Sequence, residues 1–301
     1  MTTLGLIVGE WIFLGGDAVG NKFVTNLPGY ARVKAISATY IDFDETTFVA
    51  STEAGTGKNI RIFFGKAFKN ELAASIKRRS YQLERRLGND GVGIQSELVT
   101  GAFANTLTLN IPSADKINID LGFVGMNYET RSGTDGLKSG TRVSAPNDSA
   151  FNTSSVIYRM KMSILDAVTM NPSALFGFVT DAKIALANGV KPNKALGVMG
   201  AFDASAGDFE ITGSVTAYFS TVASAAAIKN NSDVELNVII ARANTGFIVD
   251  IPLMGIGGGK NAVAKDTPIT LPIEMMAARN VNDYTLLATV FSYLPNAAMP
   301  V

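Results

Sequence analysis

Alternation of apolar and polar residues runs through most of this 301-residue chain and constrains its fold more than any other feature. In NTLTLNI (105–111), Leu107, Leu109 and Ile111 fall on one face of an extended strand, opposite polar residues. Such alternation, rich in β-branched and aromatic residues, is typical of half-buried strands. The pattern recurs at 116–123, 156–165, 208–219, 234–240, 246–254, 267–277 and 284–294. It predicts a mainly β protein, a sandwich or barrel with one or two short helices.

One stretch, RRSYQLERRL (78–87), fits two structures. At helical spacing Leu83 and Leu87 share a face, whereas at strand spacing Tyr81 and Leu83 do. The surrounding β pattern favours a strand from about residue 79 to 86. We expect helices only at 67–79 and in the alanine-rich segment 220–230.

The amino-acid composition indicates that much of the protein's surface is covered by other molecules. Hydrophobic residues make up 47% and charged residues 17%, below the roughly 25% charged residues of ordinary globular domains. Copies of the same chain are the simplest cover. The 26 basic and 26 acidic residues leave no net charge, which removes the bulk attraction that a general nucleic-acid binder uses.

The chain contains neither cysteine nor histidine. This excludes disulfides, thiolate or imidazole metal sites, and catalysis by Ser–His or Cys–His pairs. The apolar N-terminal stretch MTTLGLIVGEWIFLGG lacks a basic leading segment and is interrupted by Glu10. We therefore expect neither a signal peptide nor a membrane span, and a protein that stays soluble where it is made.

Four further features invite a functional interpretation. GTGKN (55–59) and GIGGGK (255–260) lack the spacing and hydroxyl of a P-loop, so we interpret them as turn glycines between strands.

Asp42 and Asp44 could bind a cation or act as acid and base, but they fit better as the polar face of a strand whose inner face holds Ile41 and Phe43. Residues 77–86 could touch phosphates or form salt bridges between subunits. Trp11 is expected to pack, or to anchor a subunit contact.

A weak internal echo divides the chain into an N-terminal β-domain (1–150) and a C-terminal β-domain (151–301), which could pack as one unit. In both parts an alternating strand precedes a spacer and a pair of strands that ends in glycine. The polar segment 139–155 lies between them and is expected to form an exposed loop or a boundary.

The order of these segments resembles the tail tube proteins, or major tail proteins, of long non-contractile-tailed bacteriophages (siphophages). The resemblance rests on an S-Y-x-L-E strand at 80–84, on G-x-x-x-N-T-L-x-L-x-I-P at 101–112, and on G-F-x-G at 122–125. In the second half, Gly213, Thr216 and Phe219 match the family's strand, and 246–259 matches its late strand and glycine turn. Asp120 and the segment 131–155 depart from the family's pattern.

The resemblance implies a structural role without cofactors or catalytic residues. Monomers, made in the bacterial host cytoplasm, would close into rings. Stacked rings would form a hollow β-barrel in the virion tail that conducts genomic DNA into the host cell. Other expected partners are tail terminator, tail tip and tape measure proteins, with no membrane. Glu84, Asp120 and Glu210 are our candidates for lumen-facing carboxylates that repel the DNA. Two similar domains per chain favour three copies per ring, whereas one requires six.

Two other classes remain as alternatives. A β-rich adhesin or carbohydrate-binding module would show clustered exposed aromatic residues, but the eight tyrosines and one tryptophan are scattered along the sequence. A hydrolase using Asp42 and Asp44 would need two acids that converge across an apolar cleft.

Overall fold

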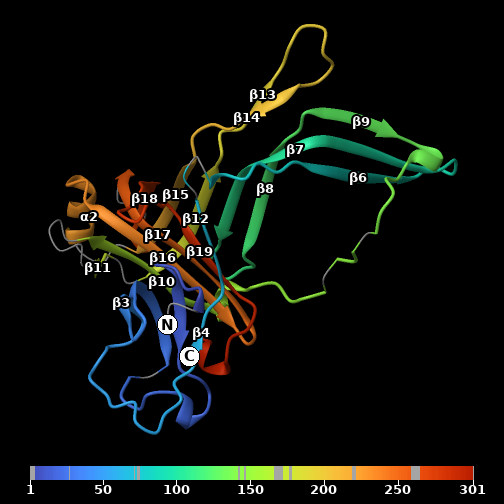
Figure 1. Cartoon of the computed structure of the whole chain (residues 1–301). Coiled ribbons are helices and arrows are strands. Elements are labelled where there is room, and N and C mark those ends of the chain that lie inside the picture. The colour runs from blue at the N-terminus through green and yellow to red at the C-terminus, as the bar shows by residue number, and fades with distance from the viewer. Residues whose placement is uncertain are drawn as a thin grey trace.

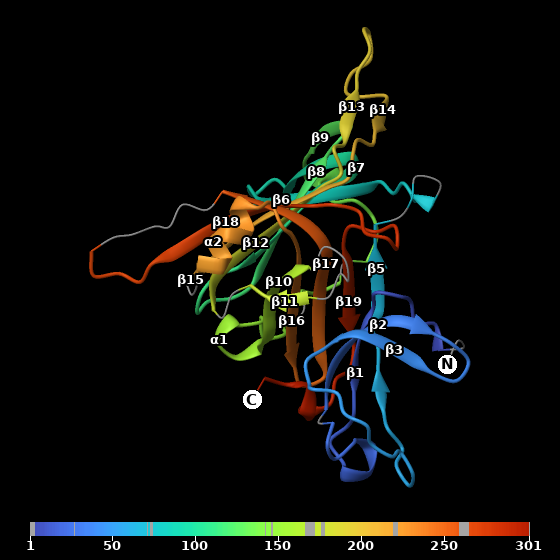
Figure 2. The ribbon, with the colours of Figure 1, turned by 90° about the vertical axis from the view of Figure 1, so that its left-hand side faces the viewer.

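A computed structural model describes residues 4–26, 28–70, 72, 75–141, 143–145, 147–165, 172–175, 178–218, 222–258 and 265–300. Antiparallel sheets form three packed layers (Figures 1 and 2). The first layer is an N-terminal sheet in the order β3-β2-β1-β4. Its strands are β1 (Trp11–Leu14), β2 (Gly29–Ile36), β3 (Ile41–Thr46) and β4 (Ile62–Phe63).

A second, thirteen-stranded sheet among the described residues folds over to provide the other two layers. Its main path is β11-β10-β16-β17-β18-β15-β12-β7-β6, with β5, β8, β9 and β19 attached at its sides. The strands are β5 (Lys66–Lys69), β6 (Tyr81–Asn89), β7 (Ile94–Ile111), β8 (Asn118–Val124), β9 (Asn127–Arg131), β10 (Ile157–Leu165), β11 (Pro172–Ala174), β12 (Val179–Ala187), β15 (Glu210–Tyr218), β16 (Asp233–Arg242), β17 (Thr245–Gly258), β18 (Thr270–Ala277) and β19 (Leu287–Phe291). The described helices are α1 (Thr153–Val156) and α2 (Val222–Lys229), with 3-10 turns at Val19–Asn21, Gly133–Asp135 and Asn296–Ala298.

Strand β16 shows how alternation builds the layers. Val234, Leu236, Val238 and Ile240 enter the main core, where they meet residues of β7, β12, β15 and β18. The alternate residues of β16 face the N-terminal sheet, and Ile239 belongs to a second core with Trp11, Phe13 and Tyr30. Because β16 is covered on both faces, it is buried nearly throughout, including the polar Glu235 and Asn237, unlike the strands of the outer layer.

Two projections leave this body (Figure 1). The first, which we call the arm, is the ribbon formed by β6, β9 and the first half of β7. The second is a hairpin of β13 (Lys191–Asn193) and β14 (Asp203–Ser205), which continues from the end of β12. The N-terminal sheet lies at the opposite end of the molecule from the hairpin.

The predicted strands are confirmed, and the ambiguous stretch is a strand, because Tyr81–Asn89 pairs with the start of β7. The helix predicted at 220–230 is present as α2. The helix predicted at 67–79 is wrong, since Lys66–Lys69 forms β5 and pairs with β19, and residues 76–79 are irregular. That ladder outweighs the local helix propensity of alanine and lysine. Glu71, Ala73 and Ala74 lie outside the described residues.

The described residues of 139–155 are mostly exposed, and they lead from the arm to α1 as the predicted loop. Strand β7, from the first half of the sequence, pairs with β12 from the second half. The two predicted domains, 1–150 and 151–301, thus share one sheet, and their division stays a prediction.

Candidate functional site

One face of the outer layer, which we call the polar face, is formed by β8, β7, β12, β15 and β18. It lies opposite the main core, because alternate residues of the same strands are buried there. Cross-strand register aligns Asn110 of β7 with Lys183 of β12, Lys183 with Ser214 of β15, and Ser214 with Glu274 of β18. Directly opposed residues share a face, so these four side chains form one polar row across the layer.

Carboxylates dominate the charge of the polar face. Asp120 lies opposite Thr108, Asp181 opposite Thr216, and Glu210 opposite Ala187, so these acids share the face with Glu274. Lys183 is its one lysine on these five strands, and all five charged residues are exposed. Four acids and one lysine leave a net charge of −3. Such a surface repels phosphates at close range.

Polar neighbours fix two of these acids. Asn110 Nδ2 donates to Asp120 Oδ2 at 2.9 Å and to Asn118 Oδ1 at 2.8 Å. Thr216 Oγ1 donates to Asp181 Oδ1 at 3.2 Å, and Thr180 Oγ1 donates to its other oxygen at 3.0 Å. These hydrogen bonds hold the carboxylates along the strands while leaving them exposed to solvent.

Of the three predicted lumen residues, the structure brings Asp120 and Glu210 onto this face, and it places Glu84 elsewhere. Glu84 lies on β6 in the arm, opposite the buried Leu98, and its side chain is 18% exposed. Together with Leu98 and residues 138–141, Glu84 lines an open pocket beside the arm. Its lumen position stays a prediction.

Sequence reasoning missed Asp181, Lys183 and Glu274. Residues 179–187 are rich in alanine, so their alternation is weak, although charged residues at 181 and 183 did mark a polar side. Glu274 lies in a segment that was expected to be a strand, but nothing local reveals which strand it pairs with.

The edge of the polar layer is strand β8, which pairs only with β7 among the described residues. On its core side, Ile119 and Leu121 lie opposite Leu109 and Leu107, and yet they are 52% and 60% exposed. The core-facing side of the outer layer therefore continues onto β8, where no other part of the monomer covers it. An unpaired edge with exposed apolar residues favours association with another chain.

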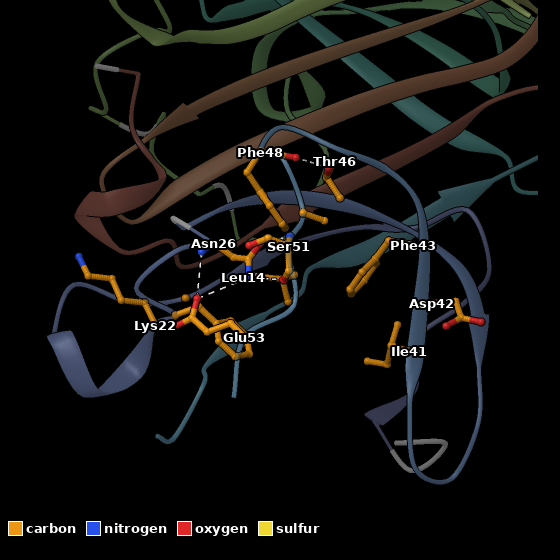
Figure 3. A pocket seen from close by; sticks show the side chains of 13 residues that line it. Leu14, Lys22, Asn26, Ile41, Asp42, Phe43, Thr46, Phe48, Ser51 and Glu53 are labelled. Carbon is orange, nitrogen blue, oxygen red and sulfur yellow. Dashed lines mark hydrogen bonds between the residues drawn. The ribbon is translucent and has the colours of Figure 1, made fainter. Parts of the chain in front are cut away.

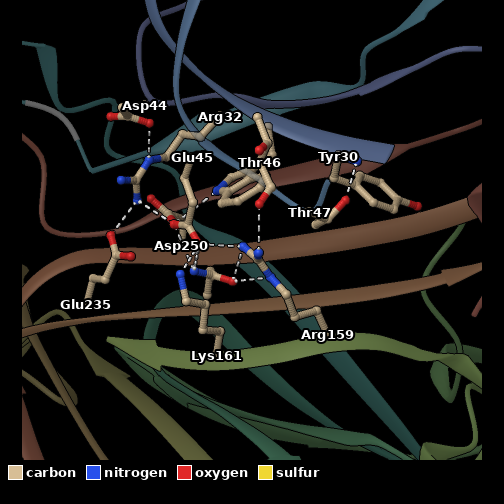
Figure 4. A network of polar contacts seen from close by, with 12 residues as sticks. Tyr30, Arg32, Asp44, Glu45, Thr46, Thr47, Arg159, Lys161, Glu235 and Asp250 are labelled. Atoms are coloured by element: carbon tan, nitrogen blue, oxygen red, sulfur yellow. Dashed lines mark hydrogen bonds and ion pairs between the residues drawn. The ribbon is translucent and has the colours of Figure 1, made fainter. Parts of the chain in front are cut away.

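A buried cluster of charges joins the N-terminal sheet to the layer behind it (Figure 4). Arg32 Nη1 lies 2.9 Å from Glu235 Oε2 and 3.3 Å from Asp250 Oδ1, while Arg32 Nε lies 2.8 Å from Asp44 Oδ1. Glu45 Oε1 pairs with Arg159 Nη2 at 2.7 Å and with Lys161 Nζ at 2.8 Å. The ion pairs from Arg32 and Glu45 to β10, β16 and β17 hold the N-terminal sheet against the second sheet.

Trp11 lies within this cluster. Its Nε1 donates to Asp250 Oδ1 at 3.0 Å, and the guanidinium carbons of Arg32 and Arg159 lie 5.9 and 5.1 Å from the ring centre. The indole is fully buried, so the expected packing role of Trp11 is confirmed, and its cation–π contacts reinforce the charged cluster.

The net pKa shifts of the acids in the cluster differ in direction. Burial raises the pKa of Asp250 to about 6, against the opposing effects of Arg32 and of the hydrogen bond from Trp11. Burial also raises the pKa of Glu235. For Glu45, burial acts upward but is outweighed by Arg159 and the other cations, so its pKa is lowered. The cluster therefore joins the two sheets and also makes their contact depend on pH.

An open pocket of about 360 Å³ lies against the N-terminal sheet and is lined by Leu14, Ile41, Phe43 and Phe48 (Figure 3). On its other side, Glu53 accepts hydrogen bonds from the backbone N–H groups of residues 24, 25 and 26 at 2.6, 2.7 and 3.1 Å. Lys58 Nζ donates to the same carboxylate at 2.7 Å. Glu53 thus joins two loops that frame the pocket.

The described residues contain no group of three or more acids that could hold a metal ion. On β3, the exposed Asp42 and Asp44 alternate with the less exposed Ile41 and Phe43, as expected for a strand with one polar side, and Asp44 pairs with Arg32. The glycines at 255–258 belong to β17 and not to a turn; residues 259–264 lie outside the described chain. No described helix has the length and apolar character needed to cross a membrane.

Comparison with known proteins points to one family. A family model described as "phage tail tube protein" matches residues 9–277, which include all three layers, the arm and the hairpin. No curated protein matches the chain. The match spans most of the 301 residues. The chain belongs to the phage tail tube protein family and is a structural subunit of the tail tube in the virion, not an enzyme.

Proposed function

We propose that copies of this chain close into rings in which the polar face lines the lumen. The observation that carries the proposal is the excess of exposed carboxylates on that face, with Asp120, Asp181, Glu210 and Glu274 against Lys183. DNA carries a negative charge at every phosphate, so an acidic wall lets it pass without binding. Genomic DNA and a tape measure protein would occupy this lumen without tight binding.

Edge strand β8 supports lateral closure of the ring. Its free edge can continue the outer layer into the sheet of the next copy, and the same contact covers Ile119 and Leu121. Closure removes an edge that otherwise promotes uncontrolled pairing. A ring of this kind uses two different surfaces of each copy, because its contacts are heterologous.

The number of copies per ring is three or six. The internal echo in the sequence favours three, with two tube-lining units per chain. The described structure has one polar face, to which both halves of the sequence contribute strands, and this favours six copies, each with one tube-lining sheet.

The resemblance of residues 80–125 of this chain to siphophage tail tube proteins supports a tail of the long, non-contractile type. Such a tail ends in terminator and tip proteins, which we propose as partners at the two ends of the tube.

Light scattering across concentration, followed by electron microscopy, tests the proposal. We expect rings and hollow tubes, with three- or six-fold symmetry in end views. A chain that remains a monomer at high concentration, even when seeded with phage tail tips, would overturn it.

Chemical labelling tests the lumen assignment separately, because the chain has no cysteine of its own. Asp120→Cys and Glu210→Cys should react with a polymer-linked maleimide as monomers and be protected in tubes. Asp42→Cys, exposed on the N-terminal sheet, is the matched control and should react in both states. Equal reaction of all three in tubes would place the polar face on the outside.

A further inference from the structure

The tip of the β13–β14 hairpin concentrates exposed apolar side chains. Between the two short strands, residues 194–202 form a nine-residue tip in which Leu196 is fully exposed, Met199 is 94% exposed and Phe202 is 63% exposed. Single exposed apolar residues are ordinary on a protein surface, whereas several at the end of one projection indicate a contact.

The body of the protein braces this hairpin. Ala201 N donates to Met126 O at 2.9 Å, which ties the tip to the connection between β8 and β9. Gly200 has φ +85°, and a Cβ there would lie 2.6 Å from Met126 O, so a glycine is required for this close approach. The tip is held in place before any partner arrives, which reduces the entropy cost of binding.

Strands β12 and β15 run from this hairpin to the opposite end of the outer layer. Phe178 and Tyr218 lie at that end, joined by the hydrogen bond from Tyr218 N to Phe178 O at 3.1 Å, and they are 76% and 42% exposed. The far end therefore also presents aromatic surface. It lies beside α1, because Thr153 of α1 and Phe178 line the same pocket.

A pocket of about 230 Å³ opens at this far end, lined by Ile111, Pro112, Ile157, Met160, Phe178 and Val179, with Asp181 also at its wall. Ile111 belongs to the main core, and Ile157, Met160 and Val179 pack against it. The pocket is thus an open end of the core. It is smaller than the roughly 300 Å³ at which small-molecule sites begin, and its size suits one or two side chains.

The hairpin tip and the pocket at the far end of β12 both present apolar surface, and they also carry opposite charges. Lys194 is exposed at the start of the hairpin tip, and the carboxylate of Asp181 is exposed beside the pocket. Because the two surfaces lie at opposite ends of β12, one copy cannot satisfy both by itself. A contact between different surfaces that does not close on itself repeats without limit and builds a filament.

We propose that the hairpin tip of each copy inserts into this pocket of a copy in the adjacent ring. Leu196 and Met199 enter the pocket, and Lys194 pairs with Asp181. The proposal rests on the assembly of the chain into stacked rings, and it assigns the longitudinal contact to two named surfaces.

Engineered cysteines test it directly, because the chain has none. The double variant Met199→Cys/Phe178→Cys is assembled into tubes, oxidised, and run on a denaturing, non-reducing gel. We expect a ladder of dimers, trimers and longer species, because each chain bonds to two neighbours. The single variants should remain monomeric. A matched control pairs Met199→Cys with Val49→Cys, which is 91% exposed in the loop that follows β3. Tubes without a ladder, or the same ladder in the control, would overturn the proposal.

A charge substitution separates this contact from ring formation. Leu196→Asp/Met199→Asp should leave rings intact and raise the concentration needed for tubes about tenfold or more, because two apolar side chains lose their pocket. Val49→Asp/Val281→Asp, at positions more than 90% exposed, should assemble like the wild type. Tubes of the hairpin variant at the wild-type concentration would refute the stacking contact but leave the tube function intact. If the wild type itself forms neither rings nor tubes, both proposals fail.

Discussion

Arg32 on β2 and Glu235 on β16 form an ion pair of 2.9 Å between two sheets, with side chains that are 9% and 1% exposed. The same guanidinium reaches Asp44, Asp250 and, at 3.8 Å, Glu45, so one cation serves four acids. A buried pair contributes little relative to apolar packing, but removal of one partner leaves a charge that nothing compensates. The attachment of the N-terminal sheet therefore depends on Arg32 more than on any surface bridge.

Arg32→Ala should lower the free energy of unfolding by about 3–5 kcal/mol, because Glu235 and Asp250 remain buried without their cation. Chemical denaturation measures this change. The control is Arg85→Ala, which removes a 3.7 Å bridge to Glu97 from a side chain that is 77% exposed, and it should cost no more than about 1 kcal/mol. Equal effects of the two substitutions would contradict the importance given to the buried cluster.

Asp250 should make the stability depend on pH. Its pKa is about 6 in the folded protein, above the ordinary value of 3.8, so the folded state binds its proton more tightly than the unfolded state does. This contribution is fully present below pH 3.8 and is lost as the pH rises to about 6. The total is on the order of 3 kcal/mol.

Asp250→Asn keeps an acceptor for Trp11 but cannot titrate. Unfolding free energies measured from pH 3.5 to 7 should therefore fall more steeply for the wild type than for this variant. Both proteins retain Glu45, which acts in the opposite direction because its pKa is lowered, and Glu235, which acts in the same direction because its pKa is raised. Parallel curves would show that Asp250 does not titrate in this range.

Glu53 is predicted to order the loops beside the pocket of Figure 3. Burial acts against its charged form, but Lys58 and three backbone N–H groups outweigh it and lower the pKa of Glu53 to about 2. Its contribution is present above pH 4.5 and is lost as the pH falls toward 2. Glu53→Gln should speed amide hydrogen exchange at residues 24–26. Asp42→Asn, at the same pocket, should leave these rates unchanged.

Leu121→Arg should block ring closure, because it places a charge on the uncovered core side of β8. Leu121 is 60% exposed in the monomer, so the variant should fold normally, and sedimentation should show monomers where the wild type forms rings. Leu196→Arg, at the hairpin tip, is the comparison and should still form rings. Normal rings of Leu121→Arg would exclude β8 from the lateral contact.

Reversal of charge on the polar face should turn a passive wall into a DNA-binding one. Asp120→Lys/Glu210→Lys changes its net charge from −3 to +1, since each substitution adds two units. Tubes of this variant should retain short duplex DNA at low salt and release it as salt rises. Asp42→Lys/Asp148→Lys, at exposed positions, should not. Equal retention by both variants would indicate that the polar face does not line the lumen.

Alternation in the sequence predicted the longer strands of the second sheet and, in segments such as 105–111, the side that faces the core. It placed Asp120 and Glu210 on strands but could not show that they share a face, because this depends on the pairing of β7 with β8 and of β12 with β15. The sequence could not predict the buried charge cluster, because this too depends on which strands pair and pack. Arg32, Glu45, Arg159, Glu235 and Asp250 come from separate strands, and isolated charged residues are ordinarily expected at the surface.

Strand β7 gives the arm a mechanical role. It runs for 18 residues, bonded to β6 and β9 along its first half and to β8 and β12 along its second. Its hydrogen bonds lie across the strand direction, so a pull on the arm loads the β7–β12 ladder in shear, and its bonds must break together and not one by one. A force applied to the arm therefore passes directly into the outer layer, which is the wall of the tube in the arrangement that we propose.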